Sequence, residues 1–222
     1  MEVSEAIKQR KSVRAFKPDP VPEDILYNII EQALRAPSWA NTQPWEFMVV
    51  SGQPLKEIQD GFVARGMQDP QSEVDRPYEF PEPYMARIRA LAPRDRKEMT
   101  RDEMEERTLL NFRHYGATTC IYLLVGKSIL RQSKGINVWS MYDSGSAVQN
   151  LMLLATDRGL GTIAQAQAVV YPDIIRKVVK VPETKLIALG IAIGYPDWDD
   201  PVTERRTERE PMDKVVTWYG FD

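Results

Sequence analysis

Histidine and cysteine are almost absent from this sequence of 222 residues, which holds one of each, His114 and Cys120. A single cysteine excludes a disulfide within the chain and leaves a cysteine-based zinc site without its ligands. Metal hydrolases and Ser/His/Asp enzymes usually draw on histidine, and His114 would have to serve alone. We therefore expect no metal site and no hydrolytic triad. Cys120 is expected to be inert core, and His114 to be a structural hydrogen-bonding residue rather than a proton donor.

An excess of positive charge is also missing, because 29 Lys and Arg residues stand against 32 Asp and Glu residues. Contact with nucleic-acid phosphates needs clustered cations along one face, so we expect no nucleic-acid partner. The longest apolar stretches, such as 186–194, are far shorter than the ~20 residues that a membrane-spanning helix requires. The opening segment MEVSEAIKQRKS lacks the apolar stretch and cleavage site of a secretory signal. The sequence thus predicts a cytoplasmic protein without membrane contact.

The sequence does contain a series of apolar patterns suited to one core. A chain of this length buries roughly 70% of its unfolded surface, and we predict a single domain over residues 1–222. The patterns predict helices over about 23–36, 54–67, 100–112, 142–158 and 172–178, and strands over 46–50, 120–126, 161–164 and 186–193. Gly159 lies where a left-handed residue would end a helix. Strands and helices do not alternate regularly, which favours an α+β fold.

Two segments depart from these patterns. Residues 68–93 are rich in proline, charge and aromatic side chains, and a predicted helix follows them. We interpret the whole segment, from about 68 to 113, as an insertion over a site. Residues from about 195 to 222 form a polar arm that nevertheless ends in the apolar run Val215-Val216-Thr217-Trp218-Tyr219. Such an end is too apolar to stay exposed, and we expect it to pack on another surface, with a partner subunit as the candidate.

Three polar clusters are candidate sites, and each has a plain structural alternative. The run Arg10-Lys11-Ser12-Val13-Arg14 could grip a phosphate, or it could be the solvated face of an N-terminal helix. The segment 36–45 could line a site with its hydroxyl, amide and indole groups, or it could be a turn whose tryptophans fill the core. The segment 159–167 could let a flat ligand approach backbone N–H groups, or its glycines could simply end a helix.

Taken together and in this order, the clusters resemble the FMN-dependent nitroreductase family. The resemblance covers nearly the whole chain. The proline- and tyrosine-rich insertion, with Asn111-Phe112-Arg113 after it, resembles the branch that acts on nitroaromatics such as nitrobenzoates. The matching motifs are Arg10-Lys11-Ser12-Val13-Arg14, Pro37-Ser38 with Asn41-Thr42-Gln43-Pro44-Trp45, Gln149-Asn150-Leu151 ahead of Gly159-Leu160-Gly161-Thr162, and Arg209-Glu210-Pro211. Lys11 stands where the family has a second arginine, which keeps the charge but loses a bidentate fork.

The resemblance implies a central mixed or antiparallel sheet surrounded by helices, in an intertwined homodimer. FMN would lie at the subunit interface, with the C-terminal arm embracing the partner. The phosphate would be held by Arg10, Ser12 and Arg209, with Arg206 and Lys11 nearby. Arg14 matches the position that faces the N1/O2 edge of the flavin, where a fixed cation favours reduction because negative charge accumulates there.

Other site residues follow from the same resemblance. Pro37, Ser38, Trp39 and Asn41 would contact the flavin of the other subunit. Gln165, Ala166 and Gln167 would pass its N5 and O4 atoms and offer backbone N–H groups. In the insertion, an apolar lid over the acceptor would include Tyr78, Phe80, Tyr84 and Phe112, although plain core packing is an equal alternative for each.

The activity implied is an FMN-dependent oxidoreductase that uses NAD(P)H in a ping-pong cycle to reduce nitroaromatic compounds. The flavin carries the hydride, so no catalytic side chain is needed. Two alternatives stay open: reduction of another acceptor, such as a quinone, an activated alkene or a halogenated aromatic, and a flavin-binding protein without turnover. The sequence has no dinucleotide fingerprint, so it does not choose between NADH and NADPH.

Overall fold

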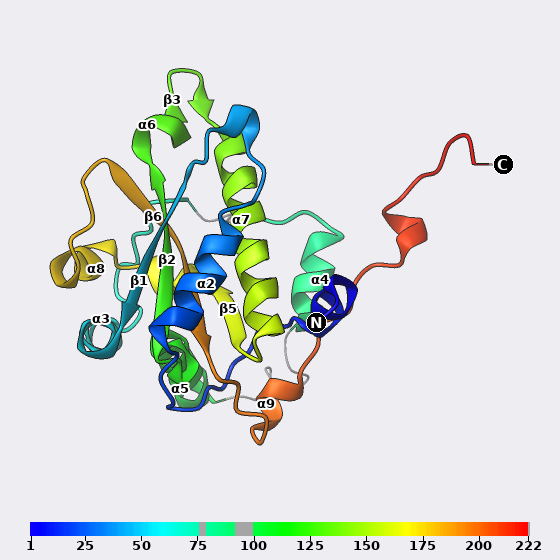
Figure 1. Cartoon of the computed structure of the whole chain (residues 1–222). Helices are drawn as coiled ribbons and strands as arrows, with labels where there is room; N and C mark the ends of the chain where they lie inside the picture. Colours follow the sequence, from blue (N-terminus) through cyan, green and yellow to red (C-terminus); the bar gives the residue numbers. More distant parts are fainter. Residues whose placement is uncertain (76–78, 92–99, 222) are drawn as a thin grey trace.

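A four-stranded antiparallel sheet forms the centre of the molecule (Figure 1). The structure is a computed structural model that describes residues 1–75, 79–91 and 100–221. The strands lie in the order β1 (Trp45–Ser51), β2 (Thr119–Gly126), β6 (Lys185–Gly194) and β5 (Gly161–Gln165), and every neighbouring pair is antiparallel. Helices surround this sheet without regular β-α alternation, which confirms the expected α+β class.

The helices and the short elements complete the chain. The α-helices are α1 (Val3–Gln9), α2 (Glu23–Ala33), α3 (Gly52–Arg65), α4 (Tyr84–Leu91), α5 (Arg101–Phe112), α6 (Lys127–Leu130), α7 (Val138–Asp157), α8 (Pro172–Val178) and α9 (Pro201–Glu204). Short 3-10 turns cover Trp39–Asn41, His114–Gly116, Ala166–Val169 and Met212–Lys214, and β3 (Arg131–Gln132) pairs with β4 (Gly135–Ile136). None of the helices in the described part of the chain has both the length and the apolar character needed to cross a bilayer.

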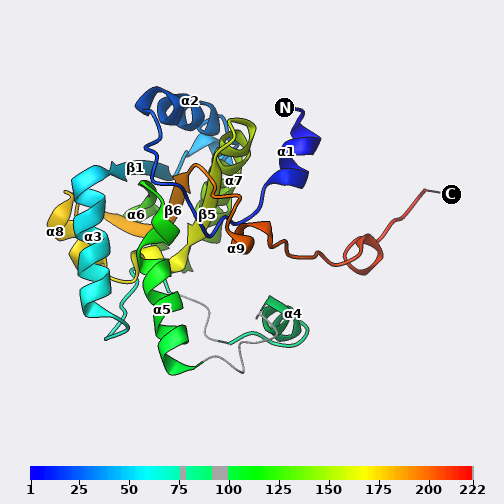
Figure 2. The same cartoon turned by 90° about the horizontal axis from the view of Figure 1, so that it is seen from below.

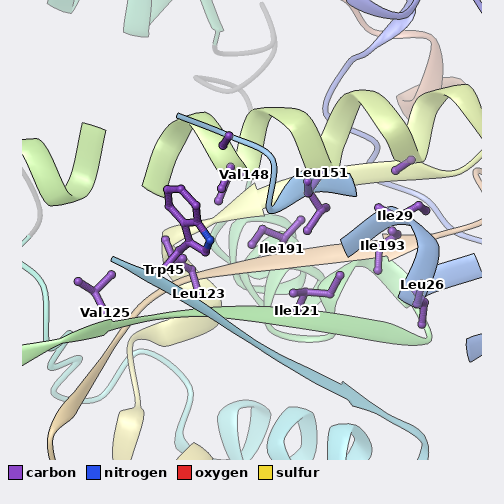
Figure 3. Packing of buried hydrophobic residues seen from close by; sticks show 14 of the residues in the cluster. Leu26, Ile29, Trp45, Ile121, Leu123, Val125, Val148, Leu151, Ile191 and Ile193 are labelled. Atoms are coloured by element: carbon purple, nitrogen blue, oxygen red, sulfur yellow. The ribbon is translucent and has the colours of Figure 1, made fainter. Parts of the chain in front are cut away.

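Both faces of the sheet are covered, and β2 shows why. Its residues Ile121, Leu123 and Val125 point into a core shared with α2 and α7, where Leu26, Ile29, Val148 and Leu151 pack (Figure 3). The alternate residues Cys120, Tyr122 and Leu124 point into a second core on the opposite face, shared with α3, α5 and α8. Successive side chains of a strand alternate between faces, so a strand buried on both faces reads as one continuous apolar run. The sequence CIYLLVG is such a run.

Most predicted elements are confirmed, and the differences concern their ends. Helix α8 has the predicted bounds, Thr100 and Glu103 form the expected capping box of α5, and Gly159 has a φ of 75° after α7. Helix α2 ends at Ala33, before the predicted residue 36. Helix α7 starts four residues earlier than predicted because the Asn137 side chain accepts a hydrogen bond from the Trp139 N–H and caps it. Helix α4 and the β3–β4 hairpin were not predicted.

Helix α4 of the insertion and the end of the C-terminal arm lie apart from the sheet. Figure 2 shows α4 separated from the helices that cover the sheet, and the arm running away from the body. An ion pair of 2.7 Å between Arg87 of α4 and Glu210 joins the two segments. At the end of the arm, Trp218 and Phe221 contact each other edge to face and are more than half exposed.

Glu73 fastens the start of the insertion to the sheet at an irregular point. The β2–β6 register shifts between Leu123 and Leu124. Nearby, a carboxylate oxygen of Glu73 accepts the backbone N–H of Ile187 at 2.7 Å. The same carboxylate receives two hydrogen bonds of 3.1 Å from Arg176, which also donates to the Lys185 carbonyl. The Glu73 and Arg176 side chains are each only 19% exposed, so water has little access to these hydrogen bonds.

Replacing Glu73 by alanine is expected to lower the free energy of unfolding by about 3 kcal/mol. The change leaves the Arg176 guanidinium and the Ile187 N–H partly buried without their acceptor. Urea unfolding followed by circular dichroism measures the loss. Asp173→Asn is the matched control, because it weakens the more exposed ion pair with Arg65. This variant is expected to lower the free energy of unfolding by less than about 1 kcal/mol. Equal losses of unfolding free energy in the two variants would contradict this role of Glu73.

Candidate functional site

A cleft of about 460 Å³ opens beside the end of α1 and gathers most of the predicted phosphate-binding residues. Seven of its lining residues are Lys or Arg, and none is acidic. We call it the cationic cleft, and its lining residues are Ile7, Lys8, Arg10, Lys11, Ser12, Arg14, Gln149, Arg205, Arg206, Thr207 and Arg209. The fold thus brings together two basic segments that lie almost 200 residues apart in the sequence.

The first basic segment is extended rather than helical. Helix α1 ends at Gln9, and Arg10 at its end already has a ψ of 125°. Ser12 then forms a parallel bridge with Thr162, and the Val13 N–H donates to the Thr162 carbonyl at 3.0 Å. Val13 is buried, whereas Ser12 and Arg14 on either side of it line the cleft. The alternative of a basic face on the N-terminal helix is therefore wrong for residues 10–14.

The second basic segment follows α9. Asp200 caps this helix by accepting the Val202 N–H at 2.9 Å, and the chain leaves it in an extended conformation at Arg205. Arg206 donates to the Lys8 carbonyl at 2.6 Å, which ties the arm to α1. Arg209 donates to the carbonyl and the hydroxyl of Thr207.

The cations of the cleft repel one another. Among the described residues, no carboxylate lies within ion-pair distance of any of these seven side chains. Burial and the neighbouring Arg209 lower the pKa of Arg10. Burial and Arg206 lower the pKa of Lys11, against a smaller opposing effect of Glu204. A bound anion would relieve this repulsion, which makes the cleft suited to a phosphate group.

The predicted flavin-facing run lies farther along the same edge strand. Gln165 is three residues beyond Thr162, or about 10 Å at the rise of an extended strand. Ala164 and Ala166 are exposed, whereas the Gln165 side chain between them is buried. Since side chains alternate along a strand, Gln165 points to the side opposite the two alanines. The exposed side of residues 164–166 therefore carries methyl groups and backbone.

The loop at residues 37–43 belongs to a different hollow. The Trp39 N–H donates to Asp143 of α7 at 2.9 Å, and the Ser38 hydroxyl accepts the Gln43 N–H at 3.0 Å. Three of its residues, Ala40, Asn41 and Gln43, have positive φ angles. The hollow of about 430 Å³ beside this loop shares no lining residue with the cationic cleft. Within the described part of one chain, the two predicted parts of the site thus line separate hollows.

The two tryptophans of this segment have opposite environments. Trp45 is buried in the core, as the turn interpretation expects. Trp39 is 63% exposed, and its ring centroid lies 5.6 Å from that of Trp139. The ring centroid of Trp139 in turn lies 5.9 Å from that of Tyr142. Pro37 and Asn41 are exposed, and Ser38 is half-buried. This part of α7 therefore presents an exposed aromatic cluster.

The predicted aromatic lid needs one correction. Phe112 is completely buried and packs against Phe62 and Tyr171, with ring centroids 5.7 and 6.0 Å apart. The prediction that Phe112 belongs to the lid is wrong, because a side chain buried in the core cannot contact a ligand at the surface. Phe80 and Tyr84 are exposed, as a lid requires. Tyr78 lies outside the described residues.

The single histidine and cysteine lie in the interior. Burial lowers the pKa of His114 to about 4, and its Nδ1 atom lies 3.2 Å from the Gln59 side-chain amide. This confirms a structural rather than a proton-donating residue. Burial raises the pKa of the Cys120 thiol to about 12, which confirms an inert core cysteine.

Sequence reasoning missed several residues of the site. Lys8, Gln149, Arg205 and Thr207 line the cationic cleft. Arg205 adjoins the predicted Arg206, and Gln149 belongs to a motif that was noted without a role, so both could have been found. Asn111, which receives hydrogen bonds from the Gln165 side chain, was noted only within the run Asn111-Phe112-Arg113 and was given no role.

Comparisons with known proteins agree with this geometry. Residues 7–195 match the model of the Nitroreductase family. Similar proteins include a 4-nitrobenzoate reductase of Nocardioides sp. (strain LMS-CY), 27% identical over 97% of this chain and 89% of the relative. Nitroreductase NfnB of Mycolicibacterium smegmatis is 32% identical over 95% of this chain and 89% of its own.

Solved structures show the same fold. The FMN and NADPH-dependent nitroreductase NfnB from sphigopyxis sp. strain HMH is 30% identical, with a TM-score of 0.88 and full coverage of both chains. The FMN-dependent nitroreductase NfnB from Mycobacterium smegmatis in complex with NADPH is 27% identical, with a TM-score of 0.87 over 98% of each chain.

Proposed function

This chain belongs to the nitroreductase family, and we propose that it is an FMN-dependent oxidoreductase that uses NAD(P)H to reduce nitroaromatic compounds. The observation that carries the proposal is the cationic cleft, whose seven cations have no carboxylate partner among the residues that the structure describes. The names of its relatives support the reaction, because they include a 4-nitrobenzoate reductase and nitroreductases that depend on FMN and NADPH. A cytoplasmic location stays a prediction from the sequence.

The residues present fit FMN. A phosphate dianion needs cations and hydroxyl donors, and the cleft offers Arg10, Arg209 and Ser12 within one hollow. A flat ring needs a surface without bulky side chains, and Ala164 and Ala166 leave the side of β5 beyond the cleft open. Burial of the polar ring edge requires hydrogen bonds, for which we assign backbone groups of Gln165, Ala166 and Gln167.

The roles of these residues follow from their charge and position. Arg10, Ser12 and Arg209 bind the phosphate, and Lys11 and Arg206 add positive charge to the same hollow. Arg14, which is half-buried at the cleft, supplies a fixed cation that favours the reduced flavin. Bound FMN supplies two-electron chemistry, in which a hydride from NAD(P)H is stored and passed to the acceptor in a ping-pong cycle. Phe80 and Tyr84 form the exposed apolar surface proposed for the acceptor.

A homodimer is part of the proposal. The loop at 37–41 and the cationic cleft do not share a hollow within one chain, so a second copy is needed if Ser38, Trp39 and Asn41 contact the flavin. The exposed aromatic cluster on α7 and the apolar end of the arm supply surfaces for such an association. Large exposed apolar patches of this kind are typical of interfaces.

Removing residues 212–222 is expected to weaken the dimer at least tenfold. The truncation deletes the exposed Trp218, Tyr219 and Phe221 but keeps Arg209 in the cleft. Burial of each such side chain stabilises an interface by roughly 1.5 to 3 kcal/mol. Sedimentation velocity over a concentration series measures the dissociation constant. Tyr27→Ser, at an exposed aromatic residue of α2, is the control and leaves it unchanged; a truncated chain that dimerises equally well would refute the role of the arm.

The reaction is tested by anaerobic turnover of purified, FMN-loaded protein with NADPH or NADH and 4-nitrobenzoate. We expect oxidation of the reduced nucleotide beyond one equivalent per flavin only when the nitro compound is present. Oxidation with quinones, activated alkenes or halogenated aromatics but not with nitroaromatics would favour another acceptor. Bound FMN without turnover would favour the non-catalytic alternative, and failure to bind FMN would reject the proposal as a whole.

A further inference from the structure

The side chain of Gln165 makes an unusual set of contacts at the end of β5. It is only 3% exposed, and its amide nitrogen donates to the Asn111 backbone carbonyl at 3.1 Å and to the Asn111 Oδ1 atom at 2.6 Å. A backbone carbonyl can only accept, so the atom beside it must be the amide nitrogen of Gln165. That donor in turn fixes Oδ1 of Asn111 as the second acceptor.

The other end of the same amide is left without a partner. Among the described residues, no donor reaches the buried Oε1 atom of Gln165. A buried acceptor without a partner opposes folding, and a methionine of similar size would avoid that cost. The unpartnered Oε1 atom thus offsets part of what the two hydrogen bonds to Asn111 contribute to stability, and the contact with Asn111 is the feature that uses the polarity of this glutamine.

Asn111 is itself held firmly in place. It is followed by Phe112, the last residue of α5, which packs against Phe62 and Tyr171 in the core. Phe112 thus anchors the end of α5 directly beside Asn111, so the contact with Gln165 transmits a fixed position to the end of β5.

We propose that Asn111 is a positioning residue for the cofactor: by holding the Gln165 amide, it fixes the backbone of Gln165, Ala166 and Gln167 against which the flavin ring lies. The proposal rests on the proposed function, because the flavin gives this backbone its role. The Gln165 side chain points away from the exposed alanines, so it acts through the main chain and not by touching the ring. The same contact joins the end of the insertion to the site.

The test separates positioning from structural stability. The two variants are Gln165→Met and Asn111→Leu. Gln165→Met removes the unpartnered Oε1 acceptor together with the donor to Asn111, and these effects oppose each other, so we expect the thermal midpoint of the FMN-free protein to change little. The dissociation constant of FMN, measured by quenching of flavin fluorescence, is expected to rise about tenfold in both. The double variant is expected to match Gln165→Met, since contacting residues that act as one unit are not additive.

Redox titration gives a readout that a merely structural role would not move. If the loosened backbone weakens the binding of oxidised and reduced flavin unequally, each tenfold difference between the two changes in dissociation constant shifts the two-electron potential by about 30 mV. Gln59→Leu is the matched control, because it removes hydrogen bonds to Arg113 and His114 at the same helix end without touching Gln165. It is expected to lower the thermal midpoint and leave FMN binding unchanged.

The proposal is overturned if both single variants bind FMN as tightly as the unmodified protein, or if their effects simply add. It is also overturned if Gln59→Leu weakens FMN binding as much as Gln165→Met and Asn111→Leu do. Should Gln165→Met not fold, Asn111→Leu decides alone. An unmodified protein that takes up no FMN would instead reject the proposed function, so the two failures are distinguishable.

Discussion

Replacing Arg10 and Arg209 together by glutamine is expected to weaken FMN binding by about a thousandfold. Both side chains line the cationic cleft, one from the segment after α1 and the other from the C-terminal arm. A hydrogen bond to a charged group contributes roughly 1.5 to 3 kcal/mol, so the loss of two corresponds to a hundredfold to ten-thousandfold. Glutamine keeps some hydrogen-bonding ability, which places the expectation in the middle of that range.

Equilibrium dialysis of FMN against the FMN-free protein measures the effect. Binding to the unmodified protein is expected to weaken as salt is added, whereas the double variant is expected to respond less because two cations are gone. Riboflavin, which lacks the phosphate, serves as a second ligand and is expected to bind both proteins alike. Arg35→Gln, an exposed position outside the cleft, is the protein control. A double variant that retains FMN would mean that the phosphate lies elsewhere.

Lowering the pH from about 6.5 to about 4 is expected to reduce the free energy of unfolding by about 3 kcal/mol through His114 alone. Burial lowers the pKa of this side chain from 6.5 in the unfolded chain to about 4 in the fold. Between these values the unfolded chain binds a proton that the folded protein excludes, so acid favours unfolding. Above pH 6.5 both states are neutral, and the effect disappears. One pKa unit corresponds to 1.36 kcal/mol, which gives the stated magnitude.

Urea unfolding at pH 7.0, 5.5 and 4.5 checks this expectation against His114→Asn. His114 has a φ of 52°, and asparagine tolerates this left-handed conformation better than most residues. The variant removes the titrating group while the carboxylates stay, so the difference between the two proteins isolates the histidine. We expect the unmodified protein to lose more stability on acidification than the variant. Parallel pH profiles would show that His114 becomes protonated without unfolding.

Local sequence patterns predicted much of the fold, because many helices and strands depend on residues that are neighbours in the sequence. The apolar run of β2, the capping box at Thr100 and the proline that opens α8 each depend on a few consecutive positions. The basic run at 10–14 was also visible, together with its chemistry. Its extended conformation was not, because the pairing that imposes it comes from Thr162, far along the chain.

The sequence by itself determined which groups are available: unpaired cations in two segments, small residues along β5, and a histidine and cysteine too few for hydrolysis. Only the tertiary structure decided which groups meet. It placed Arg10 and Arg209 in one cleft, withdrew Phe112 into the core, and turned Gln165 toward Asn111. The physical reason is that charge and periodicity are properties of single residues and short windows, whereas burial and contact depend on the path of the whole chain.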